Sequence, residues 1–196
     1  MGFLPISLGV MLLYDLQIGL RASGGEVYAM VDVFPNVLGL ALILWGLIRL
    51  AKRAGPCKTE IICDACMTLF SVFVLVKDTL LYARFYAGGT ESAAGQCVGF
   101  CQHILLLGLL TLVFRKTGSV LSDLGEAKLA RAHIRMTSFA LMEGLVYVVC
   151  FILGMIGTAG FLLTFLGVLR MLDMLLWLFI VWYGGINQLR AALRAN

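Results

Sequence analysis

Residues 161–184 read FLLTFLGVLRMLDMLLWLFIVWYG, and this apolar run decides the class of fold. It is long enough to cross the hydrocarbon core of a bilayer as one helix, because such a crossing takes about 20 apolar residues. Other segments of the chain are apolar over a comparable length. The predicted spans are residues 3–20, 30–50, 61–86, 97–114, 136–157 and 161–184.

The composition supports the same class. The 196 residues are 61% hydrophobic and 13% charged, whereas a soluble domain has about a quarter of its residues charged. The spans are continuously apolar and do not alternate with a period of two, which favours helices over the strands of a barrel. The sequence therefore predicts an all-α integral membrane protein, a six-transmembrane-helix bundle forming one membrane domain over residues 1–196. Because no Lys or Arg precedes Arg21, we expect residues 3–20 to be a retained helix and not a signal peptide.

Lysine and arginine predict the orientation of this bundle. Cytoplasmic loops carry an excess of both residues. Eleven of the 15 basic residues fall at the end of the second span or after it, after the fourth span, or in the tail: Arg49, Lys52, Arg53, Lys58, Arg115, Lys116, Lys128, Arg131, Arg135, Arg190 and Arg194. The opposite loops hold only Arg21 and Arg84. We therefore expect both termini to be cytoplasmic, in a bacterial plasma (inner) membrane.

The longest loop, residues 115–135, is predicted to contain a cytoplasmic amphipathic helix at about 122–135. Asp123 and Glu126 have the spacing of an N-terminal capping pair. Lys128, Arg131 and Arg135 recur at helical spacing and form a basic stripe. We expect this stripe to contact anionic lipid headgroups; a docking site for a protein partner at the cytoplasmic face is the alternative.

Small residues and regular spacings suggest how the helices associate. Ala140 and Gly144 form a small-xxx-small pair, which predicts that the span 136–157 is central in the packing. Asp15, Asp78 and Glu143 recur at intervals of about 65 residues, each in the first helix of a hairpin. This register raises the hypothesis of three pseudo-repeated helical hairpins. The units would cover residues near 1–55, 60–118 and 130–190.

Ionisable side chains inside a membrane are costly, which makes them candidate functional residues. Arg170 and Asp173 are three residues apart and share a helix face, so they are predicted to neutralise each other. Lys77 and Asp78 are adjacent and point about 100° apart, so each is predicted to need a partner on another helix. The substrate-path or ion-path candidates are Asp15, Lys77, Asp78, His103, Glu143, Arg170 and Asp173.

These groups can meet in one polar cluster at or above the membrane midplane. Such a cluster is an ion-pair network that fixes helix packing, the lining of a substrate or proton path, or a catalytic centre. No catalytic motif supports the third interpretation. His103 and His133 are predicted on opposite sides and cannot share a site. The cysteines are likewise predicted on both sides of the membrane, so they cannot form one metal site. We expect no metal site, no cofactor and no catalytic residue.

The basic excess is accounted for by topology, so no nucleic-acid partner is expected. Short-looped helices in a chain of 196 residues look in outline like the substrate-binding subunits of vitamin-uptake systems, by size alone. The first hypothesis is a small transporter or transporter subunit with the polar cluster as its binding site, which needs a hydrated cavity. The alternative is a non-enzymatic membrane scaffold or regulatory subunit, in which the charged groups are paired and dry. Neither hypothesis names a small-molecule substrate.

Overall fold

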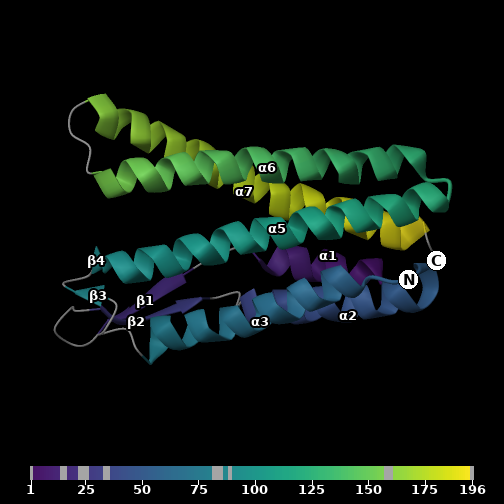
Figure 1. Ribbon diagram of the computed structural model, residues 1–196, viewed down its shortest axis with the longest axis horizontal. Coiled ribbons are helices and arrows are strands. Elements are labelled where there is room, and N and C mark those ends of the chain that lie inside the picture. The colour runs from purple at the N-terminus through teal and green to yellow at the C-terminus, as the bar shows by residue number, and fades with distance from the viewer. Residues whose placement is uncertain are drawn as a thin grey trace.

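The described part of the chain is mainly helical. The computed structural model describes residues 2–13, 17–21, 27–32, 36–80, 86–87, 90–156 and 161–194. Within these ranges six helices and two short antiparallel β hairpins follow one another (Figure 1). They are α1 (Phe3–Leu12), β1 (Gln17–Arg21), β2 (Val27–Asp32), α2 (Asn36–Ala54), α3 (Lys58–Thr79), β3 (Tyr86–Ala87), β4 (Thr90–Glu91), α5 (Ala93–Asp123), α6 (Ala127–Ile156) and α7 (Phe161–Arg194).

The first predicted span is much shorter than expected. Helix α1 ends at Leu12, and β1 begins five residues later. The prediction over 3–20 was wrong because hydropathy does not separate an apolar helix from an apolar strand that follows it. The second span, predicted at 30–50, likewise begins with β2, and α2 starts only at Asn36. The third, predicted at 61–86, ends as a helix at Thr79.

Four helices are long and apolar enough to cross a membrane among the described residues: α3, α5, α6 and residues 163–194 of α7. Large apolar side chains cover their outer surfaces; Leu69, Leu145 and Val168 are 72%, 67% and 62% exposed. A contiguous apolar exterior of this kind marks a surface that meets lipid or another protein. The hydrophobic excess in the composition is therefore on the outside of the bundle as well as in its core.

Helix α1, and not α6, is the most buried of the helices. It lies against α2 and α7, and Phe3, Ile6 and Val10 have no exposed surface. Glycines allow the close approach to α2. A Cβ atom on Gly9 would lie 2.5 Å from the carbonyl oxygen of Gly39, a separation that real Cβ atoms do not tolerate.

The prediction that the span 136–157 is central was therefore wrong. Helix α6 packs on two helices, α5 and α7, as α1 does, but it is the least buried of the four long apolar helices. Ala140 is 1% exposed, as its place in the small-residue pair predicts, but Leu141 on the same turn is 65% exposed. A small residue identifies a contact face; it does not show how much of the helix is buried.

The turn between α5 and α6 replaces the predicted amphipathic helix. Gly125 has a φ of +80°, and the amides of Gly125 and Glu126 donate to the carbonyls of Ser122 and Leu121. This pair of bonds is the Schellman ending of a helix, in which the glycine takes the left-handed conformation. Asp123 consequently ends α5 and does not cap a new helix, and residues 127–135 are the first turns of α6.

The two ends of the bundle differ in chemistry. Both described chain ends, the α2–α3 turn and the α5–α6 turn lie at one end, which we call the basic end (Figure 1). The eleven Lys and Arg residues of the predicted cytoplasmic set belong to the parts of α2, α3, α5, α6 and α7 nearest this end. The four β strands lie at the other end, the hairpin end.

The repeat hypothesis finds partial support in the order of elements. In the first two units, a helix is followed by an antiparallel β hairpin and then by a second helix. The glycine pairs 24–25 and 88–89 fall between the paired strands in the sequence, but they lie outside the described residues, as does Asp15. The first helices of the three units differ in length, with 10, 22 and 30 residues. Superposition of the units stays a prediction.

Candidate functional site

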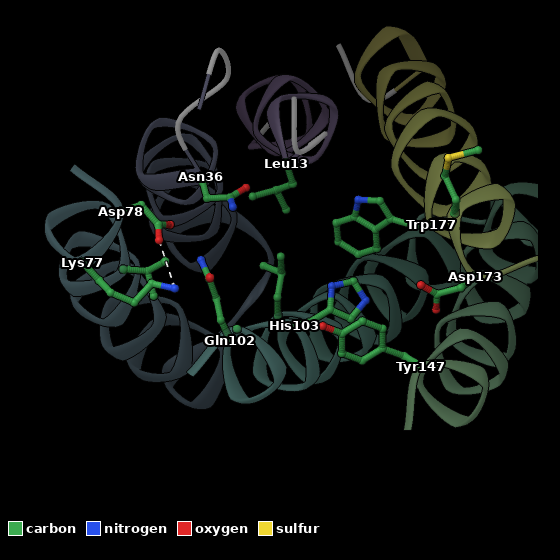
Figure 2. A pocket seen from close by; sticks show the side chains of 13 residues that line it. Leu13, Asn36, Lys77, Asp78, Gln102, His103, Tyr147, Asp173 and Trp177 are labelled. Carbon is green, nitrogen blue, oxygen red and sulfur yellow. Dashed lines mark ion pairs between the residues drawn. The ribbon is translucent and has the colours of Figure 1, made fainter. Parts of the chain in front are cut away.

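A cavity of about 320 Å³ lies between α3, α5, α6 and α7, in the half of the bundle nearer the hairpin end (Figure 2). Its size is at the lower limit of the 300–1,000 Å³ that small-molecule sites occupy. Leu13 after α1 and Asn36 at the start of α2 complete the wall. The lining residues are Leu13, Asn36, Val74, Lys77, Asp78, Gly99, Gln102, His103, Leu106, Tyr147, Asp173, Met174 and Trp177.

Most of the ionisable residues singled out from the sequence gather at this cavity. Lys77, Asp78, His103 and Asp173 line it, although they come from three different helices. Glu143 lies directly behind His103. Two candidates are not placed there: Arg170 does not line the cavity, and Asp15 lies outside the described residues.

Lys77 and Asp78 form an ion pair on one wall of the cavity (Figure 2). The Nζ atom of Lys77 lies 3.0 Å from Oδ1 of Asp78, and the two side chains are 3% and 12% exposed. The prediction that these neighbours could not satisfy each other was wrong. A lysine stem has four carbons and can curve around the helix to reach an adjacent carboxylate. Lys77 nevertheless faces the interior of the bundle, since its side chain is almost fully buried.

His103 and Glu143 form a second pair, which joins α5 to α6. The distance between Nε2 of His103 and Oε1 of Glu143 is 2.5 Å. Glu143 has no exposed surface, and its Oε2 atom has no hydrogen-bond partner among the described residues. The histidine is 19% exposed on its side chain, because its ring faces the cavity. His103 therefore connects the open space to a fully buried carboxyl group.

Aromatic rings surround His103 on the same side. The centroid of its imidazole lies 4.0 Å from that of Tyr147 on α6 and 4.9 Å from that of Trp177 on α7. Tyr147 in turn stacks on Phe100 with a centroid distance of 5.8 Å. These contacts hold three neighbouring helices in register through ring packing. We call the rings of His103, Tyr147 and Trp177 the aromatic wall.

Asp173 lies beside the aromatic wall, one turn before Trp177 on α7 (Figure 2). Its Oδ1 atom is buried and has no hydrogen-bond partner in the part of the chain that the structure describes. Arg170 forms no ion pair with it within the same residues. Arg170 is exposed, and its guanidinium lies next to Gly154 on α6. The predicted self-neutralised pair was wrong because the long arginine side chain extends away from the cavity.

Sequence-based prediction did not identify four residues of the site: Asn36, Gln102, Tyr147 and Trp177. None carries a charge, so a search for ionisable groups inside apolar spans could not find them. Gln102 could have been identified from the sequence, because a side-chain amide next to a histidine in an apolar run also needs a polar partner. Asn36 required knowledge that α2 starts there.

A second buried polar cluster lies nearer the basic end and does not line the cavity. Gln188 on α7 donates from Nε2 to Oγ1 of Thr117 on α5 over 2.8 Å. Thr117 donates to the carbonyl of Val113, and Nδ1 of His133 lies 2.9 Å from the carbonyl oxygen of Leu129. The side chains of Thr117, His133 and Gln188 have no exposed surface. The two histidines thus belong to separate clusters, as predicted.

The geometry supports binding of a small solute by charged, amide and aromatic groups. Both signs of charge line one space, and the aromatic wall adds an apolar surface to it. Comparisons of the chain with protein families, with curated proteins and with solved structures find no match.

Proposed function

We propose that this chain is an integral membrane protein that binds a small polar solute in the cavity, as a small transporter or as the substrate-binding subunit of one. The observation that carries the proposal is the cavity of about 320 Å³ at the charged residues. A transporter needs such a space, whereas a scaffold needs its buried charges paired and dry. The residues assigned to solute binding are Lys77, Asp78, Gln102, His103, Tyr147, Asp173 and Trp177.

We further propose a bacterial inner membrane as the location, with the basic end in the cytoplasm. The exposed apolar surface of α3, α5, α6 and α7 supports insertion, and the gathering of Lys and Arg at one end supports the orientation. Lys128, Arg131 and Arg135 are all exposed on one face of α6, which suits contact with anionic headgroups. The cavity then opens on the outer side of the bilayer.

A pair of glycines on α5 allows a direct test. Gly99 lines the cavity and Gly108 lines an apolar groove between α3 and α5. A Cβ atom at either position would meet nothing within 4 Å. Gly99→Trp should fill the cavity, and Gly108→Trp is its matched control.

The measurement is the melting temperature of the purified protein in detergent with a panel of small cations, anions, zwitterions and neutral solutes. A ligand at about 100 times its Kd stabilises by about 2.7 kcal/mol, which raises the melting temperature by several degrees. At least one solute should do this for the natural protein and for Gly108→Trp, but not for Gly99→Trp. If no solute raises it, the scaffold alternative is favoured and the proposal fails.

A further inference from the structure

Among the residues that the structure describes, the carboxyl groups around the cavity outnumber the basic groups. Asp78, Asp173 and Glu143 face the cavity or contact a residue that lines it, against Lys77 and His103. Lys77 lies 3.0 Å from Asp78, so their charges offset each other. On the opposite wall, Glu143 contacts His103, whereas Asp173 has no basic side chain within ion-pair distance among the described residues.

Asp173 is the carboxylate of this excess that lines the cavity without an ion-pair partner among the described residues. The Oδ1 atom of Asp173 is buried and lacks a partner within the described residues. A buried carboxylate oxygen without a hydrogen bond is costly. A positive charge in the cavity beside the Asp173 carboxylate lowers that cost through electrostatic attraction. Lys77, on the far wall in Figure 2, lies beside Asp78 instead.

The surroundings of Asp173 suit an organic cation. Trp177 and Tyr147 lie on either side of the His103 ring, and the carboxylate of Asp173 lies beside these three rings (Figure 2). A cation over the face of an aromatic ring is attracted by the quadrupole of that ring, most strongly for Trp. The attraction grows when water is excluded, and Trp177 is only 9% exposed. A free anion would meet Asp173 and the negative ring faces unfavourably.

We propose that the cavity selects a small organic cation, an alkylammonium group that binds in the cavity beside the Asp173 carboxylate and the Trp177 ring. This inference rests on the proposed function, because it names the class of solute for the same site. The uncharged polar part of the ligand extends toward Gln102 and Asn36, whose amides line the other side. Lys77 and Asp78 form the fixed boundary of that side.

The fluorescence of Trp177 tests the inference directly. Trp45 and Trp182 are 48% and 49% exposed and can be replaced by Phe, which leaves Trp177 as the reporter. The probes are choline, propylammonium, the neutral choline isostere 3,3-dimethyl-1-butanol, and butyrate. At least one of the two cations should change the Trp177 emission with a Kd about tenfold or more below that of the isostere and of butyrate.

Asp173→Asn keeps the shape of the side chain and removes its charge. It should weaken cation binding by about tenfold or more, with little effect on the isostere. Glu126→Gln, which removes a carboxylate at the basic end, should leave binding unchanged. A thermal melt of each variant establishes that it is folded.

The outcomes separate the two proposals. Equal or stronger binding of the isostere or of butyrate, or of another neutral or anionic solute from the thermal panel, overturns the cation inference and leaves the proposed function standing. An unchanged cation Kd in folded Asp173→Asn also overturns it. Absence of binding by every solute overturns both.

Discussion

The two histidines of this chain both lie among packed helices, but only His103 lines a cavity. His103 and His133 both come from the bundle formed by α5, α6 and α7, and both contact polar groups. His103 lines a cavity and is bonded to Glu143, whereas His133 has no exposed surface and is bonded to the carbonyl of Leu129 one turn earlier. A buried polar residue is therefore a candidate binding residue when a cavity adjoins it.

The largest effect is expected from the ion pair on the cavity wall. Lys77→Met removes the ammonium group from beside Asp78, and breaking a buried pair costs about 3 kcal/mol or more of unfolding free energy. Denaturant or thermal unfolding in detergent measures the loss. The double variant Lys77→Met/Asp78→Asn should recover part of it, since the remaining charge is gone. A Lys77→Met protein as stable as the natural one would contradict a structural role for this wall.

Two glutamines sharpen the comparison between the clusters. Gln188→Leu removes the donor to Thr117 in the closed cluster and should lower the unfolding free energy by about 1–3 kcal/mol. Gln102→Leu, beside the cavity, should change stability by about 0.5 kcal/mol or less. Solute binding should show the opposite order, with loss in Gln102→Leu only. Equal effects of the two substitutions on stability and binding would mean that the clusters do not differ in kind.

The smallest effect is expected at the surface of the basic end. Arg194 lies 2.6 Å from Glu126, and their side chains are 59% and 33% exposed. Ion pairs at such exposed positions contribute about 0–1 kcal/mol. Arg194→Ala should therefore shift the melting temperature by a few degrees at most, and less at high salt. A loss comparable to that of Gln188→Leu would show that the C-terminal turn of α7 holds the bundle together.

The sequence was informative about the coarse fold and about charged groups. Continuous apolar runs located most of α3, α5, α6 and α7. The cost of charge in an apolar run pointed to Lys77, Asp78, His103 and Asp173 as candidate site residues. Both inferences rest on local chemistry, which a linear sequence contains. The division of basic residues between the two ends follows from the same kind of argument.

The remaining features depend on contacts between distant segments. Hydropathy could not show that an apolar strand follows α1, nor that Gly9 and Gly39 bring α1 and α2 together. The pairing of Lys77 with Asp78 depends on side-chain conformation. The contribution of Tyr147 and Trp177 depends on which neighbours they meet. Only the packed bundle determines these.

The most direct test of the account is whether water-soluble reagents reach the cavity. In a variant whose six cysteines are replaced by Ser or Ala, Gly99→Cys places a thiol in the cavity and Gly108→Cys places one in the apolar groove, both without steric conflict. If the cavity is open to water, a charged methanethiosulfonate reagent added from outside should modify Cys at position 99 and not at position 108. The cationic reagent should react faster than the anionic one. No modification at position 99 in a folded protein would contradict the claim that the cavity is an open binding site.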